Sequence, residues 1–146
     1  MEIVFATGNA NKLAEAQRVL GERFHLVMPS ELGFNGELPE THETLYENAV
    51  EKALFIWNKF QKNCFADDTG LEVDALGGAP GVHSARYAGE PKSPPDNIRK
   101  LLKELEGVPA EKRTARFRCV VALIEEGVLH TFEGICEGHI TTTLHG

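Results

Sequence analysis

The chain has 146 residues, 42% of them hydrophobic and 25% charged, which is enough for one globular domain with a full-sized core. Its 15 Lys and Arg against 22 Asp and Glu give a formal net charge of -7, which disfavours a long nucleic acid as a partner. No apolar run approaches the ~20 residues of a membrane helix, and the start of the chain lacks the basic and apolar regions of a signal peptide. We therefore expect a cytoplasmic protein with no membrane partner.

The first elements predicted are a strand, a helix and a second strand. Residues 2–7 form a β-rich apolar run, and from residue 13 to residue 20 apolar side chains recur at helical spacing. Residues 25–28 are again typical of a strand, and the glycines and proline within 30–42 indicate a loop. This alternation is typical of an α/β fold.

A long amphipathic helix follows this loop. Thr44 and Glu47 have the spacing of a capping box, which marks its start. One continuous apolar stripe then runs along it, formed by Leu45, Ala49, Ala53, Ile56, Trp57 and Phe60. After Asn63 we expect a brief buried strand over 64–66, with the polar residues 67–70 at its end, and a half-buried strand over 71–76.

The second half of the chain predicts a helix and three strands. Ser93 has the features of an N-cap ahead of a helix that Gly107 closes. Residues 115–123 and 128–136 alternate as the two arms of a hairpin, and a last strand is expected over 138–143. The cysteines lie far apart in apolar stretches, which predicts buried reduced thiols at Cys64, Cys119 and Cys136.

One candidate functional segment joins the first strand to the first helix, and it consists of Thr7, Gly8, Asn9, Ala10, Asn11 and Lys12. The amides of a helix start and the ammonium of Lys12 favour an anion, for which phosphate is the natural ligand. The spacing equally fits a simple turn with Asn9 or Asn11 as the helix cap. The segment matches neither the dinucleotide-binding nor the P-loop fingerprint.

A second candidate is an acidic group formed by Glu40, Glu43, Glu47, Asp67 and Asp68. Carboxylate oxygens suit Mg²⁺, which often binds phosphate oxygens at the same time. Glu47 is explained by a capping role and Glu43 by its place in the first helical turn. Glu40 and the pair Asp67 and Asp68 therefore remain as candidate metal ligands. Adjacent residues of a strand point to opposite faces, so one aspartate at most faces a shared site; the sequence slightly favours Asp68.

Other polar residues give weaker signals. The six histidines show no metal-ligand spacing, and Ser84 lacks the Gly-x-Ser-x-Gly context of a nucleophile. Arg86, Arg116 and Arg118 could meet phosphates. For Arg116 and Arg118 the alternating pattern favours a solvated sheet face.

Four segments, in order along nearly the whole chain, form a set of motifs: Phe5 to Lys12, Glu40-Thr41 with Tyr46 to Ala49, Ala66 to Leu71, and Leu76 to Gly81 with Ser84 to Tyr87. Together they resemble the inosine triphosphate pyrophosphatase family, whose members remove non-standard purine nucleotides from the nucleotide pool. The resemblance implies that this chain is a hydrolase of ITP, dITP and XTP. It would cut the α–β phosphoanhydride with the help of Mg²⁺ and release a monophosphate and pyrophosphate.

The resemblance also implies the fold and the assembly. We expect an α/β protein with a long mixed β-sheet flanked by helices and with two lobes around a cleft. This fold is described as ITPase-like, or as an anticodon-binding-like α/β fold. Residues 1–146 would form a single nucleotide pyrophosphatase domain, and two copies would form a homodimer.

Site residues follow from the same resemblance. The segment from Thr7 to Lys12 binds the triphosphate of a purine nucleoside triphosphate, with Lys12 neutralising phosphate charge. Glu40 and Asp68 bind the metal, and Asp68 is also the general base for water. Thr69 contacts the substrate, at a position where family members more often have serine.

The resemblance has one departure. The family continues with a Gly-Phe-Gly-Tyr-Asp-Pro segment and a Ser-His-Arg segment, neither of which occurs here. We therefore expect a member that lacks the C-terminal part of the family. An alternative is an inactive fragment that binds nucleotide or metal, or only self-associates. An aspartyl-phosphate phosphatase is disfavoured, because its Asp-x-Asp pair is absent from residues 67–69.

Overall fold

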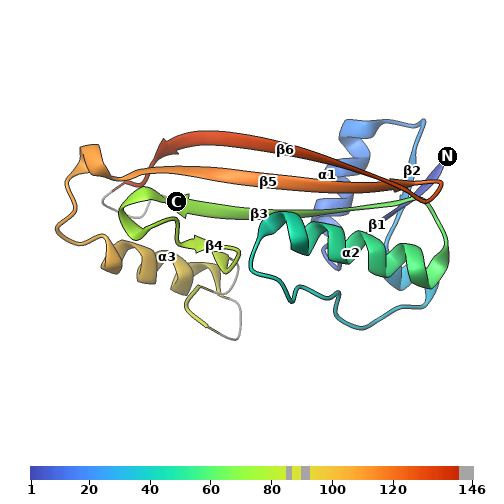
Figure 1. Cartoon of the computed structure of the whole chain (residues 1–146), viewed down its shortest axis with the longest axis horizontal. Helices are drawn as coiled ribbons and strands as arrows, with labels where there is room; N and C mark the ends of the chain where they lie inside the picture. Colours follow the sequence, from blue (N-terminus) through green and yellow to red (C-terminus); the bar gives the residue numbers. More distant parts are fainter. Residues whose placement is uncertain (85–86, 90–92, 142–146) are drawn as a thin grey trace. The chain divides into compact units, whose positions relative to one another are not determined.

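The computed structural model describes residues 1–84, 87–89 and 93–141. It contains three α-helices and six strands among these residues, together with short 3-10 turns (Figure 1). In chain order the elements are β1 (Glu2–Phe5), α1 (Ala10–Leu20), β2 (His25–Val27), α2 (Leu45–Phe60), β3 (Cys64–Val73), β4 (Pro80–Gly81), α3 (Pro94–Glu104), β5 (Thr114–Glu125) and β6 (Val128–His139). None of the helices in the described ranges is long and apolar enough to span a membrane.

The strands form one mixed sheet. Its order is β2-β1-β3-β5-β6, and β4 pairs with β3. Strand β1 is parallel to both β2 and β3, whereas β3 and β4 are antiparallel. The predicted α/β class with a long mixed sheet is confirmed, while the predicted cleft between two lobes stays a prediction.

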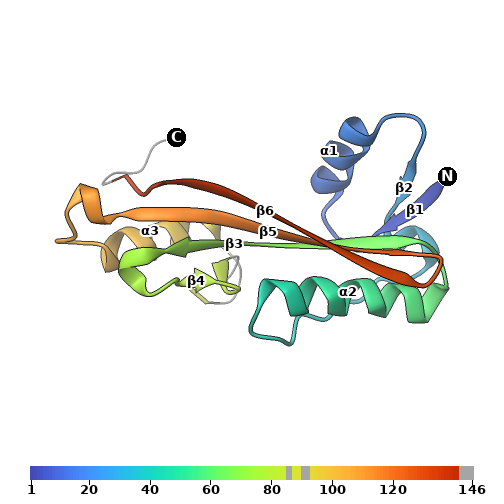
Figure 2. The same cartoon turned by 45° about the horizontal axis from the view of Figure 1, so that its top comes forward.

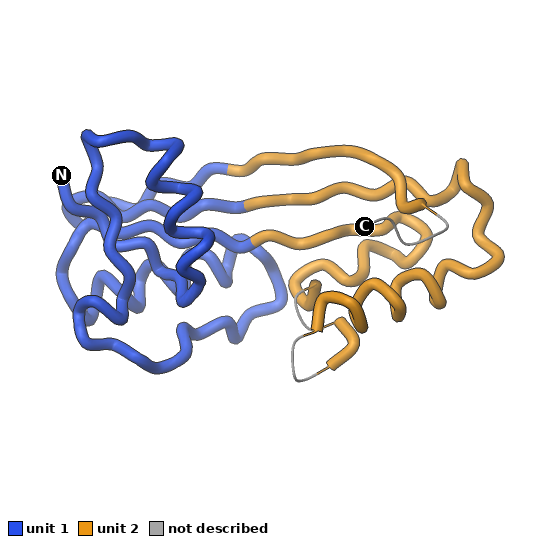
Figure 3. The backbone as a smooth tube through the Cα atoms, turned by 180° about the vertical axis from the view of Figure 1, so that it is seen from behind, with its two compact units in different colours: residues 1–68, 120–132 blue, residues 69–119, 133–146 orange. Residues whose placement is uncertain are grey.

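The chain divides into two compact units, which Figure 3 distinguishes by colour. The first unit consists of residues 1–68 and 120–132, and the second of residues 69–119 and 133–146. Strands β3, β5 and β6 each contribute residues to both units (Figure 3). The prediction of a single domain over residues 1–146 stays a prediction.

Each unit has its own apolar core. In the first unit Phe5 of β1 stacks on Phe65 of β3 with ring centroids 4.3 Å apart. Helices α1 and α2 lie on opposite faces of this part of the sheet (Figure 2). In the second unit α3 packs its apolar side chains against β3 and β5, in a cluster formed by Val73, Leu101, Leu105 and Ala115.

The N-caps predicted for α2 and α3 are confirmed, whereas the predicted closure of α3 by Gly107 is wrong, because the helix already ends at Glu104 with Leu105 as its C-cap. Thr44 accepts a hydrogen bond from the amide of Glu47 at 3.1 Å and begins α2, which buries a stripe of side chains along one face. Ser93 caps α3 in the same way, through the amide of Asp96. Because Gln61 adopts a left-handed conformation, α2 ends at Phe60.

The hairpin of β5 and β6 is confirmed, but the separate last strand is wrong. Glu126 and Gly127 both have positive φ, as a two-residue hairpin turn with right-handed twist requires. Strand β6 then continues without a break to His139, because it can follow the long strand β5 along its whole length. Of the strand predicted over 138–143, residues 142 and 143 lie outside the described residues.

The strands predicted over 64–66 and 71–76 are instead one strand, β3, which ends at Val73. Residues 74–76 form a 3-10 turn, so the last part of the second predicted strand is wrong. Strand β1 pairs with β3 only up to Phe65, whereas β5 is its neighbour on the other side, so the backbone stays extended through residues 67–70. Asp67 and Asp68 therefore lie inside their own strand. They nevertheless lie just beyond the point at which pairing with the carboxyl end of β1 stops.

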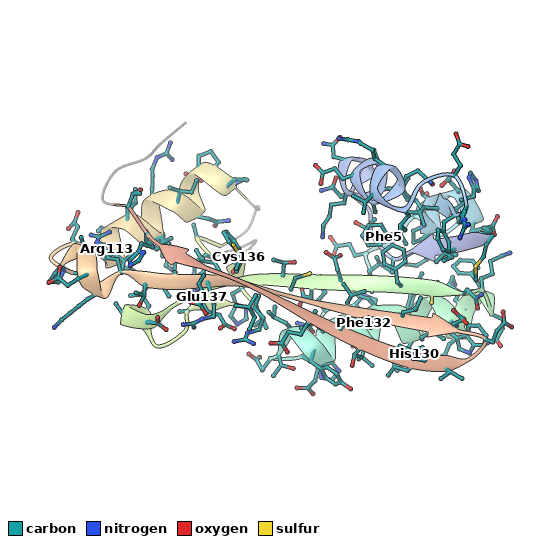
Figure 4. The ribbon with its side chains drawn as sticks, turned by 90° about the horizontal axis from the view of Figure 1, so that it is seen from above. Phe5, Arg113, His130, Phe132, Cys136 and Glu137 are labelled. Carbon is teal, nitrogen blue, oxygen red and sulfur yellow. The ribbon has the colours of Figure 1, made fainter. Side chains whose placement is uncertain are left out.

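The prediction of three buried thiols is wrong for Cys136. Cys64 is fully buried and Cys119 is partly buried, whereas Cys136 is exposed. Every residue of β6 is exposed, so the apolar pattern of this strand does not bury its cysteine. Figure 4 shows Cys136 on this strand together with His130 and Phe132.

Candidate functional site

The start of α1 is organised by Asn9. Its Oδ1 accepts hydrogen bonds from the amides of Asn11 at 2.9 Å and Lys12 at 3.2 Å, so Asn9 is the N-cap. The hydroxyl oxygen of Thr7 in turn accepts from the amide of Asn9 at 3.1 Å. The helix-cap interpretation of this segment is thus confirmed, and an anion at the same place would compete with the Asn9 carboxamide for these amides.

The charge pattern at the start of α1 differs from that of the other helices. No acidic residue occupies its first turn, whereas α2 and α3 carry Glu47 and Asp96 there. An acidic side chain in the first turn offsets the positive end of a helix dipole. The start of α1 therefore keeps its attraction for an external anion.

Lys12 is held beside this helix start by Asp67. Its Nζ lies 3.1 Å from Oδ1 and 3.0 Å from Oδ2 of Asp67. The Lys12 side chain is 43% exposed, so it can meet a ligand without leaving its partner. Asp67 thus anchors Lys12 next to the segment predicted to bind phosphate.

Asp68 contacts a different lysine, because adjacent residues of a strand point to opposite faces. Its Oδ1 lies 4.0 Å from Nζ of Lys52, which extends from α2. The same ammonium donates to Oε1 of Glu40 at 2.8 Å and to the carbonyl oxygen of Asp67 at 2.6 Å. Lys52 therefore brings Glu40 and Asp68, the two predicted metal ligands, to one place.

The loop that carries Glu40 is fastened to α2 by the two residues that follow it. The amide of Thr41 donates to Glu51 at 2.8 Å, and its hydroxyl donates to the same carboxylate at 2.6 Å. The amide of His42 donates to Oδ1 of Asn48 at 2.9 Å, and the Asn48 side chain donates back to the His42 carbonyl oxygen. Glu40 is thereby positioned near Lys52 although no regular element contains it.

The carboxyl group of Asp68 is in an unusual environment. Burial raises its pKa, and the charges of Glu40 and Asp67 act in the same direction, whereas Lys52 and a hydrogen bond with Asn48 lower it. The net effect is a pKa above the ordinary value. Its Oδ2 is buried and has no hydrogen-bond partner among the described residues. A buried carboxylate oxygen in this condition favours binding a cation or a proton.

These residues fit a hard divalent cation. Glu40 and Asp68 supply oxygen ligands, and the Asp68 Oδ2 atom has no competing partner within the described ranges. Among residues 1–84, 87–89 and 93–141, no group of three or more His, Cys, Asp or Glu could hold a metal. Since Mg²⁺ usually keeps several waters and uses one or two carboxylates together with substrate phosphates, two carboxylates are sufficient.

The remaining candidates from the sequence are Thr69 and three arginines. Thr69 is exposed and begins the second unit. Arg116 pairs with Glu72, Asp74 and Glu137, and Arg118 pairs with Glu72 and Glu133, so both belong to a network of charges on the sheet. Arg86 lies outside the described residues.

Sequence reasoning missed Lys52, which is only 6% exposed. A signal for it was available: Asn48 and Lys52 are four residues apart and fall on the face of α2 that buries Leu45, Ala49 and Ala53. A polar residue within an apolar helical stripe must find a partner, because an unpaired buried charge is costly. Asn48 and Lys52 were therefore predictable as side chains aimed at polar groups in the interior.

Comparison with known proteins gives consistent matches. A model of the Ham1 family matches residues 3–146. The dITP/XTP pyrophosphatase of Porphyromonas gingivalis is 48% identical over 145 residues, which cover 99% of this chain and 74% of that protein. The dITP/XTP pyrophosphatase of Shouchella clausii is 50% identical over 141 residues, which cover 96% of this chain and 71% of that protein.

Solved structures agree with these matches. The Staphylococcus aureus Ham1 protein has a TM-score of 0.90 at 38% identity and is covered over 75% of its length by the whole of this chain. A HAM1 protein from Coxiella burnetii also has a TM-score of 0.90, at 36% identity and with 76% of its length covered. These relatives confirm the predicted class, an enzyme of the nucleoside triphosphate pyrophosphatase type. The chain belongs to the Ham1 family.

Proposed function

We propose that this protein hydrolyses the α–β phosphoanhydride of the non-standard purine nucleoside triphosphates dITP, XTP and ITP, and releases a monophosphate and pyrophosphate. The names of the relatives support this substrate class. The observation that carries the proposal is the pair of lysine–aspartate contacts at adjacent positions of β3, Lys12 with Asp67 and Lys52 with Asp68. They set two cations and a partly buried carboxylate near a helix start that attracts anions.

The phosphate-binding residues are Thr7, Gly8, Asn9, Ala10, Asn11 and Lys12. The positive end of α1 and the exposed ammonium of Lys12 attract the triphosphate, because both oppose negative charge. Asp67 keeps the Lys12 ammonium in place before the substrate arrives. Less side-chain entropy is therefore lost on binding.

Asp68 is the general base in this proposal. It accepts a proton from the attacking water, whose oxygen bonds to phosphorus while the α–β bridge breaks. A buried carboxyl with a raised pKa is a better base than an ordinary one. Lys52 opposes the accumulation of negative charge around Asp68 and Glu40.

Glu40 and Asp68 are the proposed ligands of Mg²⁺. When bound, the metal would offset phosphate charge and polarise the phosphoryl oxygens. We further propose that Thr69 contacts the substrate through its hydroxyl, that the protein works in the cytoplasm, and that it is a homodimer. Exposed apolar residues on the edge strand β6, among them Phe132 in Figure 4, support self-association.

The test is an assay of the purified chain with dITP, XTP, ITP and ATP, each with Mg²⁺ and each with a chelator. Separation of monophosphate, diphosphate, pyrophosphate and phosphate by ion exchange shows which bond is cut. We expect pyrophosphate and monophosphate from the first three nucleotides, and only with Mg²⁺. Diphosphate and phosphate as products would contradict the α–β cleavage, and nucleotide binding without product would support the inactive alternative.

A further inference from the structure

Lys52 lies where a cation shared by Glu40 and Asp68 would bind. Its Nζ is 2.8 Å from Oε1 of Glu40 and 4.0 Å from Oδ1 of Asp68. The side chain is only 8% exposed, and its third contact is the carbonyl oxygen of Asp67 at 2.6 Å. The ammonium of a side chain thus lies close to both proposed metal ligands.

This placement has an electrostatic reason. Two carboxylates close to one point repel each other, and partial burial penalises the charge of Asp68, whereas the Glu40 side chain is 36% exposed. The ammonium relieves this repulsion and is itself stabilised by both carboxylates, since an unpaired buried lysine is costly. The free protein therefore has no need of a metal to hold Glu40 and Asp68 together.

We propose that Lys52 is the resident counter-cation of the metal site and that a divalent cation binds by displacing its ammonium from Glu40, Asp68 or both. This inference rests on the proposed function, which assigns these two carboxylates to the metal. It follows that Lys52 weakens metal binding by the free protein. A metal that arrives with the phosphates of a nucleotide has additional ligands and can compete with the lysine.

Lys12 provides a matched control. It is also a lysine near the site, but both of its short contacts go to the side chain of Asp67, and it is 43% exposed. Removal of its charge changes the general electrostatic potential without vacating the position between Glu40 and Asp68. An effect that is specific to displacement should therefore be absent from a Lys12 variant.

The experiment measures binding of Mn²⁺ alone by electron paramagnetic resonance, with no nucleotide present. The variants are Lys52→Met and Lys12→Met, in which an uncharged side chain of similar length replaces each lysine. We expect Lys52→Met to bind Mn²⁺ at least about tenfold more tightly than the wild type. Lys12→Met should stay within about threefold of the wild type, because the effect of an exposed charge is screened. Equal or weaker binding by Lys52→Met would overturn the proposal.

Two further measurements keep the outcome clear. Asp68→Asn should abolish Mn²⁺ binding; if binding is unchanged, the proposed metal site is wrong and the role of Lys52 falls with it. If Asp68→Asn abolishes binding but Lys52→Met does not tighten it, only the role of Lys52 is wrong. Should Lys52→Met fail to fold, wild-type crystals with and without Mn²⁺ decide: displacement of the Lys52 ammonium supports the proposal, and Mn²⁺ bound with both contacts intact contradicts it.

Discussion

Among the described residues, each unit buries one cationic side chain almost completely, and the two have different partners. Lys52 in the first unit faces the carboxylates of Glu40 and Asp68. Arg113 in the second unit, labelled in Figure 4, donates to three backbone carbonyl oxygens instead. These belong to Leu105 at 2.7 Å, Val108 at 3.0 Å and Thr141 at 3.1 Å.

The hydrogen-bond acceptors of Arg113 and Lys52 show which of the two cations is structural and which is functional. Carbonyl oxygens cannot titrate and are fixed in the backbone, so Arg113 joins the end of α3 to the segment after β6 and has no chemistry to perform. Carboxylates can accept a proton or bind a metal, and one oxygen of Asp68 has no hydrogen-bond partner in the described residues. Burial alone therefore does not identify a site; the acceptors of the buried charge do.

The strongest way to test this difference is to remove the carboxylate. Asp68→Asn keeps the shape of the side chain but cannot act as a base or an anionic ligand, so turnover should fall by about 10²–10⁴-fold. Steady-state release of pyrophosphate from dITP measures the loss. The control is Asp74→Asn, because Asp74 pairs with Arg116 and Thr114 in the second unit, and its activity should be unchanged. Near-normal turnover by Asp68→Asn would contradict its role as the base, and Asp67→Asn would then be tested in the same way.

The counterpart in the second unit is Arg113→Met. This change leaves buried carbonyl oxygens without donors, and we expect it to lower the free energy of unfolding by about 3 kcal/mol. Urea denaturation followed by circular dichroism measures the effect. Arg116→Met is the control, because Arg116 pairs with carboxylates on an exposed sheet face and its loss should destabilise the protein far less. Equal effects of the two changes would contradict the structural role of Arg113.

A smaller effect is expected at the exposed cation of the site. Lys12→Ala should raise KM and lower kcat together, each by roughly tenfold, since the ammonium meets charge in both the substrate and the transition state. Lys12→Arg should not restore activity fully, because a planar guanidinium replaces a compact charge. Lys62→Ala is the control: this lysine is similarly exposed but pairs with Glu2. Unchanged kinetics in Lys12→Ala would leave only the helix-cap role for its segment.

Much of the fold was predictable because its signals are local. The capping box at Thr44 and the apolar stripe that follows it define α2 from neighbouring residues alone. The continuity of β3 was not, because it depends on pairing with β5, a strand far away in the sequence. The length of β6 depends in turn on how far its hairpin partner β5 extends. Local patterns indicated breaks where hydrogen bonding to a neighbouring strand keeps the backbone extended.

The candidate site shows the same division. The segment from Thr7 to Lys12 could be identified from a strand followed by a helix start. The separate partners of Asp67 and Asp68 agree with the alternation of a strand, yet only the packing of α2 shows which lysine meets which aspartate. Lys52 does not stand out in the sequence because the helical stripe is recognised by its apolar members alone.

The smallest expected effect concerns a third buried group, the thiol of Cys64. It donates to the carbonyl oxygen of Ala53 at 3.3 Å, and burial raises its pKa from 9.0 to about 11. A folded-state pKa above the unfolded value means that the protonated thiol stabilises the fold. This contribution is fully present below pH 9 and is lost as the pH rises through about 11. The wild type should therefore be more stable than Cys64→Ala at pH 7, by roughly 1 kcal/mol, and this difference should shrink and then reverse as the pH rises to 11. Urea denaturation of both proteins from pH 7 to pH 11 measures this difference directly and cancels the titration of other groups.

The matched variant Cys136→Ala, at an exposed position, should show no such dependence. A difference that stayed constant up to pH 11 would show that Cys64 only fills space. The thiol, like Arg113, would then be defined by packing and not by ionisation, and the contrast with Asp68 would become sharper.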